Sequence, residues 1–419
     1  MKKVLVVSHA FPPTGGGGVQ RVSKFVKYLP RFGWKPVVLS TRPGYYPLQD
    51  ESLLRDIPSD VRVERTFSLE PGRGSLAVSA RANAPGRTGG PAGWIIRASI
   101  DWLFIPDKSI GWVPFAVRAA RRIISEERPE AIFVTGNPFS SFLVPFLLRG
   151  SARLPYVLDF RDAWTLEPYR RRYPPWRERL ESRLEERILG RAAAAVMATG
   201  PMTEAYAARY PAVSGRLRTI TNGYDEDDFA GVGPRRGERF TFLHSGSLYR
   251  SFRRPDGFLR AYRRALDENQ DMVKGSRVVF VGNTPVELEG LIDELSLRDN
   301  VLVLGYLPHR EALRHVLGAD ALVLICGSDR MEQSGKVFEY VRAGKPVIAV
   351  AREDGAAAEV VRECEGGAVV PNDGVEEIKA AVVGCFRGEI GGGTDGLKRQ
   401  RYSRENLTKK LAEIFDEAV

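Results

Sequence analysis

Short apolar runs alternate along the first half of the chain with segments whose apolar positions recur at helical spacing. The strands expected from these runs are 4–8, 35–40, 131–136, 156–160 and 194–199. The expected helices are 19–32, 113–127 and 176–190. Strands that are apolar throughout are typical of parallel sheets covered by helices on both faces. The first half therefore predicts a doubly wound α/β domain.

The same alternation begins again near residue 240. The expected strands are 240–246, 277–282, 301–305, 321–326 and 345–351. The expected helices are 255–269, 285–296, 309–317 and 335–343. Asn222-Gly223 and the Gly-, Pro- and Arg-rich stretch 230–237 interrupt the pattern between the halves. We predict two Rossmann-like domains, 1–205 and 206–403, and allow for a last helix, 404–419, that packs back onto the first.

Length and composition fit this organisation. A chain of 419 residues exceeds one ordinary core, and 43% hydrophobic with 27% charged residues is typical of globular proteins. The net charge of +10 favours an anionic partner, such as a nucleoside diphosphate, an anionic membrane or a nucleic acid. The three cysteines and four histidines lack ligand spacing, so we expect neither a disulfide framework nor a metal site.

The chain carries no expected leader or membrane span. The apolar run after Met1 reaches Pro12-Pro13 too soon for a signal peptide, and the apolar stretch 142–148 is short for a span. Residues 71–93, rich in Gly, Pro, Ser and Ala, are expected to form a surface excursion. These features favour a soluble or peripheral protein of the cytoplasm.

A glycine run lies between the first strand and the first helix, within PPTGGGGVQR (12–21). Consecutive glycines let N–H groups at a helix N-terminus approach an anion or a sugar hydroxyl. The dinucleotide fingerprint is not met, because Gln20 or Arg21 occupies the position of its third glycine. Two alternatives stay open: Arg42 would read the 2′-phosphate of NADP, or the loop binds nothing.

Cations follow the first strand of the second half, in LHSGSLYRSFRRP (243–255). Arg250, Arg253 and Arg254 suit bidentate binding of a diphosphate. Such cations act most strongly on the charge that a leaving diphosphate gains in the transition state. Arginines on a solvated helix start are the alternative.

The most specific stretch is SGKVFEYVRAGKPVIAV (334–350). Ser334 and Gly335 open a helix whose N–H groups can hold phosphate. Lys336 and Glu339 are spaced i and i+3 and so share a helix face. This face offers a cation for a diphosphate and a carboxylate for ribose hydroxyls, unless the two residues form only a salt bridge.

This stretch resembles the donor segment of retaining glycosyltransferase family 4, whose members have the GT-B fold. Similar segments follow in TITNGYDEDDF (219–229), HSGSLYR (244–250), FVGNTP (280–285) and LGYLPHREALRHVLGADALVLI (304–325). In the first half, SHAFPPTGGGGVQR (8–21) and VLDFRDAW (157–164) resemble acceptor-side segments of a bacterial surface-polysaccharide branch. The resemblance implies transfer of a sugar, a hexose in most members, from a nucleotide-diphosphate donor to a saccharide or lipid-linked acceptor. It implies retention of configuration, no metal and no cofactor, the nucleotide sugar being a substrate.

The resemblance also implies roles for individual residues. The expected catalytic residues are Arg250, Arg253 and Lys336. The expected donor-binding residues are Gly17, Gly18, Gly246, Gly282, Tyr306, Ser334, Gly335 and Glu339. The expected acceptor-side residues are Gly16, Arg21 and Asp162, with burial of Asp162 against Arg161 as an alternative.

Two positions depart from the family. Met331 stands where many members have a first glutamate, and Glu332 is one residue out of register, so backbone amides near 333–335 would contact the sugar. Ser247 replaces an arginine that often follows the strand-end glycine. Three alternatives stay open: a sugar-nucleotide 2-epimerase of the same fold, an NADP oxidoreductase, and a non-catalytic sugar-nucleotide-binding scaffold.

Residues 169–192 combine clustered arginines with Tyr169, Tyr173 and Trp176. Basic charge beside interfacial aromatics is typical of a peripheral contact with an anionic membrane, here the inner face of the cytoplasmic membrane. A solvated helix with Glu/Arg pairs is the alternative. The chain shows no nucleic-acid-binding motif, and we expect no nucleic-acid partner.

Overall fold

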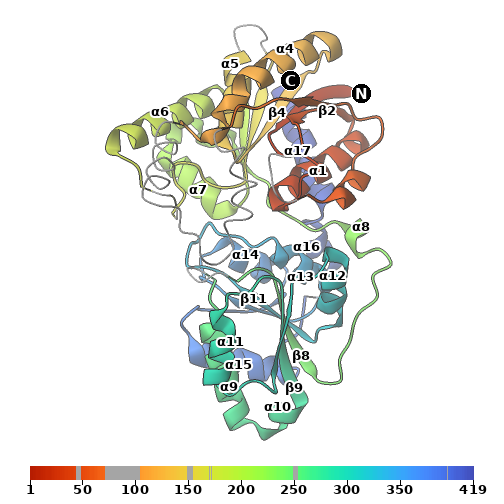
Figure 1. Cartoon of the computed structure of the whole chain (residues 1–419), viewed down its shortest axis with the longest axis vertical. Helices are drawn as coiled ribbons and strands as arrows, with labels where there is room; N and C mark the ends of the chain where they lie inside the picture. Colours follow the sequence, from red (N-terminus) through yellow and green to blue (C-terminus); the bar gives the residue numbers. More distant parts are fainter. Residues whose placement is uncertain are drawn as a thin grey trace. The chain divides into compact units, whose positions relative to one another are not determined.

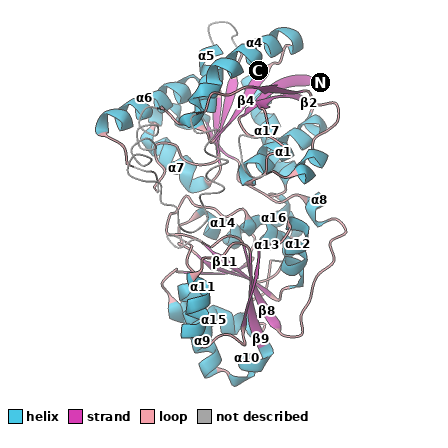
Figure 2. Cartoon of the chain, in the orientation of Figure 1, coloured by secondary structure: helices cyan, strands magenta, loops and turns pink. Residues whose placement is uncertain are grey.

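The computed structural model describes residues 1–43, 49–70, 104–148, 154–168, 170, 172–248, 253–393 and 395–419 (Figure 1). These residues form two compact units. Unit 1 comprises Met1–Thr221 and Leu407–Val419, and unit 2 comprises Asn222–Asn406. Figure 2 shows helices against both faces of the strands in each unit. The excursion expected at 71–93 lies outside the described residues.

Unit 1 is built on a parallel sheet of seven described strands in the order β3-β2-β1-β4-β5-β6-β7. These strands are β1 (Lys2–Ser8), β2 (Trp34–Thr41), β3 (Val63–Thr66), β4 (Ala131–Gly136), β5 (Tyr156–Phe160), β6 (Ala194–Met197) and β7 (Leu217–Thr219). The α-helices are α1 (Gly17–Tyr28), α4 (Val113–Glu127), α5 (Leu143–Leu148), α6 (Pro175–Arg191), α7 (Gly200–Arg209) and α17 (Arg404–Ala418). The 3-10 helices are η1 (Leu29–Phe32), η2 (Glu51–Asp56), η3 (Lys108–Trp112), η4 (Phe139–Phe142) and η5 (Pro211–Arg216).

The boundary between the units lies later than the sequence predicted. A boundary at 205/206 falls inside α7. After α7 the chain returns as β7, whose Leu217 pairs with Ala195 of β6. This pairing extends unit 1 to Thr221, because a strand of its sheet cannot belong to the next unit.

The last helix completes the core of unit 1. Leu407, Leu411 and Phe415 of α17 are buried in the same cluster as side chains of β1, α1 and β4. The ring of Phe415 packs 5.2 Å from Trp34 and 5.8 Å from Phe133. Full burial of one such apolar side chain contributes about 1.5–3 kcal/mol, so α17 is an integral element of this core.

Unit 2 is built on a parallel sheet whose described strands follow the order β10-β9-β8-β11-β12-β13. These strands are β8 (Phe240–Ser245), β9 (Ser276–Val281), β10 (Val301–Gly305), β11 (Ala321–Ile325), β12 (Val347–Val350) and β13 (Gly367–Val370). The longer helices are α9 (Asp256–Glu268), α11 (Glu287–Glu294), α12 (His309–Gly318), α13 (Lys336–Ala343), α14 (Ala356–Glu363) and α15 (Val375–Phe386). The shorter helices are α8 (Glu226–Phe229), α10 (Gln270–Gly275) and α16 (Gly396–Gln400).

Both faces of the unit 2 sheet are covered. Phe242 belongs to the cluster formed with α9 and α15, whereas the next residue, Leu243, belongs to the cluster formed with α12 and α13. Because successive side chains enter opposite cores, the strands are apolar at every position. The strand order reverses between β8 and β11, and ligands of such sheets bind outside the carboxyl ends of the strands at this reversal.

Candidate functional site

Glycine turns line the carboxyl ends of β8, β9 and β10. The Gly246 amide donates to Val281 O at 2.8 Å, and the Gly282 amide donates to Gly305 O at 2.7 Å. Gly282 has φ 125°, and a Cβ there would lie 2.2 Å from the Gly246 carbonyl oxygen. Only glycine fits this approach. Tyr306, 74% exposed, follows directly and presents its ring beside these turns.

Helix α13 is held against the end of β8. The buried Tyr340 hydroxyl accepts a hydrogen bond from Ser245 N at 2.6 Å and donates to Ser245 O at 3.3 Å. Gly335 precedes the helix as its N-cap residue, and the hydroxyl of Ser334 accepts from Lys336 N at 3.4 Å. The Lys336 stem lies 3.8 Å from the position that a Cβ would take at Gly246. The helix start and the glycine turn therefore share one site.

Glu339 lies between the side chains of Lys336 and His309. Lys336 Nζ is 2.8 Å from Glu339 Oε2, and His309 Nε2, at the start of α12, is 3.2 Å from Oε1. Burial opposes the charge of Glu339, but Lys336 and His309 together hold its pKa at about 2. Burial also opposes protonation of His309, yet Glu339 raises the pKa of the imidazole. Glu339 is thus a carboxylate at neutral pH, oriented to accept hydrogen bonds. Sequence reasoning missed His309, whose only signal was its place in a family-like segment.

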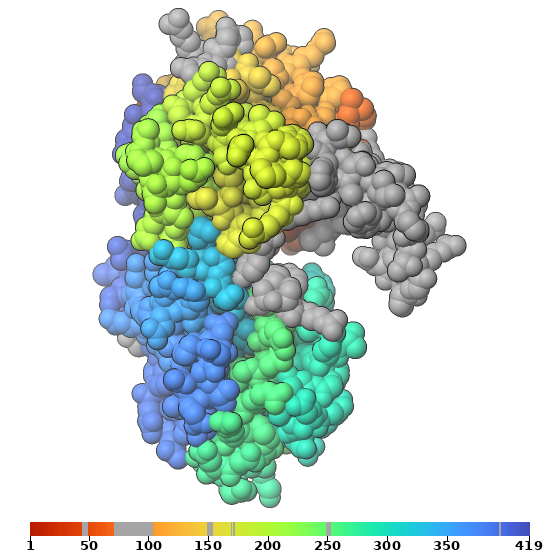
Figure 3. Space-filling model, turned by 90° about the vertical axis from the view of Figure 1, so that its left-hand side faces the viewer, coloured from red at the N-terminus to blue at the C-terminus, as the bar shows by residue number. Residues whose placement is uncertain are grey.

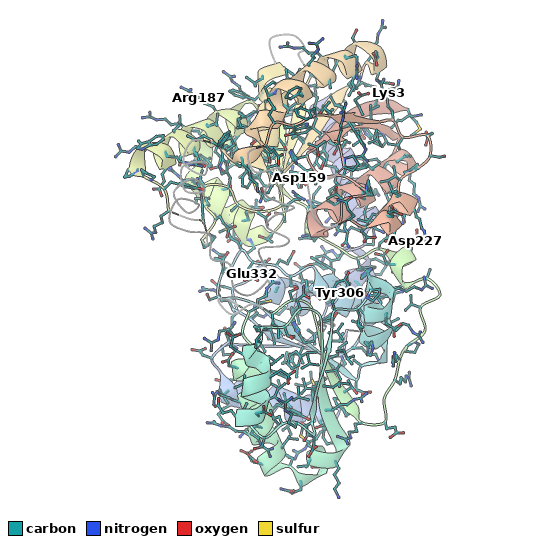
Figure 4. All side chains as sticks on the ribbon, in the orientation of Figure 1. Lys3, Asp159, Arg187, Asp227, Tyr306 and Glu332 are labelled. Atoms are coloured by element: carbon teal, nitrogen blue, oxygen red, sulfur yellow. The ribbon has the colours of Figure 1, made fainter. Side chains whose placement is uncertain are left out.

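Arg253 is paired with Glu332. Arg253 Nε lies 2.5 Å from Glu332 Oε1, and Gly327 N, which follows β11, donates to Oε2 at 3.0 Å. Their side chains are only 19% and 12% exposed. Figure 4 labels Glu332 and Tyr306 at the same end of unit 2. Arg250 lies outside the described residues.

A neutral histidine lies beneath this site. His244, buried in β8, has Nδ1 at 3.0 Å from Val323 O. Burial, followed by the charges of Arg253 and Lys336, lowers the pKa of His244 to about 4, although its bond to Val323 acts in the other direction. The His244 imidazole and the Lys336 stem both border Gly246, at 3.5 and 3.8 Å from the position of an added Cβ. The positive charge here comes from Arg253 and Lys336.

In unit 1 the glycine run starts α1. Gly16 is the N-cap residue with φ 114°, and neither Gly16 nor Gly17 has a described atom within 4 Å of an added Cβ. A Cβ at Gly18 would lie 1.5 Å from Nη1 of Arg161. Arg161 donates to Gly136 O at 2.6 Å and to Asn137 O. Gly16 and Gly17 are therefore open, and the glycine run lies beside the guanidinium of Arg161. The sequence had suggested Arg161 only as a partner of Asp162.

Arg21 is buried, which corrects its expected acceptor role. Its side chain is 0% exposed and lies 2.8 Å from Asp159 Oδ1, with further bonds to the carbonyls of Ile220 and Thr221 at 2.8 and 2.7 Å. Thr135 Oγ1 also donates to Asp159 Oδ2 at 2.8 Å. Arg21 faces inward because its helix presents it to β5, so it holds the core together and does not face an acceptor. Figure 4 labels Asp159 within unit 1.

Asp162 lies just beyond β5 and remains exposed. Nearby protein partly desolvates its carboxylate and raises its pKa, while Arg161 acts in the opposite direction and Asp159 adds to the rise. A carboxyl group with a raised pKa at a strand end is suited to exchange a proton with an acceptor. Its acceptor-side role stays a prediction.

The basic segment 169–192 has a buried face and an exposed face. Arg177, Glu181 and Glu185 of α6 are buried, with Arg177 Nε 2.6 Å from Glu181 Oε1. Trp176 is 55% and Leu180 47% exposed. Figure 3 shows α6 and α7, in yellow to light green, at the surface of unit 1. Part of the positive charge that was predicted to contact a membrane, that of Arg177, is therefore buried within unit 1.

Among the described residues, no helix has the length and apolar character needed to cross a membrane. Across the same ranges, no three His, Cys, Asp or Glu side chains converge in the manner of a metal site.

Family comparisons match both halves of the chain. Residues 16–223 match the model of the glycosyl transferase 4-like domain, and residues 239–387 match that of glycosyl transferases group 1. The chain belongs to the group 1 glycosyltransferases. This glycosyltransferase has the GT-B fold, with two Rossmann-like units, and enzymes of its group use nucleotide-sugar donors and saccharide acceptors. No curated protein sequence matches it.

Solved structures share its fold over the full length. A glycosyltransferase from Rickettsia africae is 14% identical with a TM-score of 0.66, covering 100% of this chain and 98% of its own. The lipopolysaccharide outer core galactosyltransferase WaaB is 11% identical with a TM-score of 0.61, covering 100% of both. A putative UDP-N-acetylglucosamine 2-epimerase from Listeria monocytogenes is 11% identical with a TM-score of 0.56, covering 98% and 94%. At these identities the likeness concerns the fold alone.

Proposed function

We propose that this glycosyltransferase transfers a sugar, with retention of configuration, from a nucleoside diphosphate sugar to a saccharide or lipid-linked acceptor of cell-surface polysaccharide synthesis. The observation that supports this most is the convergence of Gly246, Lys336, Glu339 and Arg253 outside the carboxyl end of β8. That is the end of the sheet, beside the reversal in strand order, where ligands of such folds bind.

In this proposal, unit 2 holds the donor. Glu339, ionised and oriented by Lys336 and His309, accepts hydrogen bonds from the two ribose hydroxyls. The exposed Tyr306 and the glycine turns at Gly282 and Gly305 border the nucleobase, because Tyr306 offers an aromatic ring and no described atom lies within 4 Å of a Cβ added at Gly305. Amides at Ser334 and Gly335 lie at a helix N-terminus and suit the sugar or a phosphate oxygen.

The chemical step requires stabilisation of a leaving diphosphate. As the glycosidic bond breaks, negative charge grows on the diphosphate, and Lys336 and Arg253 lie where they stabilise it more in the transition state than in the bound donor. An oxygen of the diphosphate takes the acceptor proton on the face from which it departs, which gives retention. In this mechanism the cations of the chain take the place of a metal ion, and no cofactor takes part.

The proposed acceptor class is that of cell-surface saccharides, because the fold is shared with a lipopolysaccharide outer core galactosyltransferase. The same fold is shared with a putative epimerase, which has no acceptor, so fold alone does not select the reaction. Asp162 and Gly16 are the acceptor-side candidates of unit 1, and Gly17 and Gly18 remain donor-binding candidates.

A screen of sugar nucleotides tests the proposal. The protein is incubated with a panel of UDP-, GDP-, ADP- and dTDP-sugars, and the products are read by NMR with and without simple saccharides. Slow release of nucleoside diphosphate and an α-configured sugar from an α-linked donor supports a retaining transferase, and Lys336→Met serves as the inactive control. A C2-epimerised nucleotide sugar would replace the proposal with the epimerase, and binding without turnover across the panel would replace it with the scaffold.

A further inference from the structure

Glu332 places a carboxylate at the reversal point of the unit 2 sheet. Its Oε2 accepts from the amide of Gly327, two residues beyond the end of β11, and its Oε1 pairs with Arg253. β11 is the neighbour of β8 across the reversal in strand order. The side chain of Glu332 is 12% exposed, so this is a largely desolvated anion in a ligand-binding position.

The two donors that hold Glu332 are of the kind that hold phosphate oxygens. A backbone N–H at a strand end and a fork-shaped guanidinium together form a common anion-binding pair. The charges of Arg253 and Lys336 both lower the pKa of the buried His244, although burial is the larger cause. The carboxylate of Glu332 thus uses two donors that could bind one phosphate group of a diphosphate, and it carries a negative charge as that group does.

Glu332 does not occupy the position of the family glutamate. That position is Met331, whose amide donates to Asp329 Oδ1 at 3.1 Å. On the other side, Gln333 donates through Nε2 to Ala356 O at 3.1 Å. The backbone of Met331 and the side chain of Gln333 are thus bonded within unit 2, and in the loop between β11 and α13 it is Glu332 that reaches Arg253.

We propose that Glu332 is an internal counter-anion: it holds Arg253 in place when no donor is bound and gives it up to the diphosphate when one arrives. The inference rests on the proposed function, because it takes Arg253 as a diphosphate ligand. Glu332 is then a positioning residue that competes with the ligand. Its competition weakens the binding of the product nucleoside diphosphate and speeds its release.

The test compares Glu332→Gln with the wild-type full-length protein. Glutamine keeps the size of the side chain but not its charge, so Arg253 loses its internal partner. Calorimetry with UDP, GDP and inorganic pyrophosphate should show about tenfold tighter binding by Glu332→Gln, a typical size for coupled sites. In turnover, kcat should fall through slower product release while KM for the donor falls too. Glu311→Gln, which removes a carboxylate paired with Arg235 at 2.9 Å on α12, is the matched control and should bind as wild type does.

Two further variants make the result decisive. In the double variant Arg253→Gln/Glu332→Gln, the gain in affinity for diphosphate should vanish, because the guanidinium that would bind the phosphate is absent. If Glu332→Gln does not fold, Glu332→Asp replaces it, since a side chain shorter by one methylene cannot span both donors and should also bind diphosphate more tightly.

The outcomes separate the two proposals. If Glu332→Gln binds nucleoside diphosphate no more tightly than wild type while Arg253→Gln binds it more weakly, the counter-anion role of Glu332 is refuted. The proposed donor site is then retained. If neither wild type nor Glu332→Gln binds any nucleoside diphosphate or pyrophosphate, the proposed function fails and this inference fails with it.

Discussion

Replacing Arg21 with alanine should destabilise unit 1 by about 3–5 kcal/mol, the usual cost of removing one partner from a buried ion pair. Arg21 and Asp159 are both 0% exposed, so the substitution leaves a buried carboxylate without its cation. Among the described side chains, the hydroxyl of Thr135 would still donate to Asp159, at 2.8 Å from Oδ2. The carbonyls of Ile220 and Thr221 would also lose a charged donor, at about 1–3 kcal/mol for an unsatisfied buried group. The loss should therefore reach the upper part of the range.

Tryptophan fluorescence measures this loss in unit 1 alone. All six tryptophans precede residue 177, and none occurs in the sequence of unit 2. Of these, Trp34, Trp112 and Trp164 are buried in unit 1 and change environment when it unfolds. Urea titrations of wild type and Arg21→Ala, fitted with a common m-value, give the difference in free energy of unfolding.

Two variants control for the loss of charge and volume. Arg218→Ala removes an exposed arginine paired with Glu417 at 3.4 Å in the same unit, and should cost less than about 1 kcal/mol. Arg21→Met/Asp159→Leu removes both buried charges and should recover most of the stability. If Arg21→Ala unfolds within 1 kcal/mol of wild type, the buried carboxylate finds other compensation and the reasoning from an uncompensated charge is refuted.

Three further predictions concern the ligand and membrane surfaces. Glu339→Gln should weaken nucleoside diphosphate binding by roughly 1–3 kcal/mol in calorimetry, and unchanged affinity in a folded variant would remove Glu339 from the donor site. Because the pKa of Glu339 is about 2 when folded and about 4.3 when unfolded, its contribution to stability is complete above pH 4.3 and lost as the pH falls towards 2. The difference in free energy of unfolding between wild type and Glu339→Gln should decrease from pH 7 to pH 3. A difference that does not change with pH would contradict the pairing of Glu339 with Lys336 and His309. Lys336→Met should lower kcat more than donor affinity, with wild-type activity persisting in excess chelator; equal losses would indicate ground-state binding only. Changing the exposed Arg179, Arg183 and Arg187 of α6 to glutamine should release the protein from anionic vesicles, at about 1 kcal/mol per charge, with added salt acting likewise. A wild type that ignores such vesicles at low salt would exclude the membrane contact.

The fold was predictable where apolar runs are long. The sequence placed β4 at 131–136 and β5 at 156–160, the bounds that the structure shows. It missed β3 and β7, which are edge strands of four and three residues with polar side chains and so carry no apolar run. The late boundary of unit 1 follows from that omission, because β7 is its last strand before Thr221.

The candidate site was predictable only where its contacts are local. Lys336 and Glu339 are three residues apart, so helical geometry alone brings them together, and their proximity is confirmed at 2.8 Å. The pairs Arg253–Glu332 and Arg21–Asp159 join residues that are 79 and 138 positions apart. Periodicity along a chain carries no information on such pairs, which arise only when strand ends meet.

Because α17 supplies Phe415 to the core of unit 1, that core joins two segments that lie on either side of unit 2 in the sequence. A ribosome that has released residues 1–221 has made a sheet without its final covering helix. Unit 2 is continuous, from Asn222 to Asn406, and is complete before α17 leaves the exit tunnel. Truncation after Asn406 would thus damage the unit that was synthesised first, because Trp34 and Phe133 would lose their ring contacts with Phe415. A stop codon that follows the codon for Asn406 is therefore a lesion of unit 1.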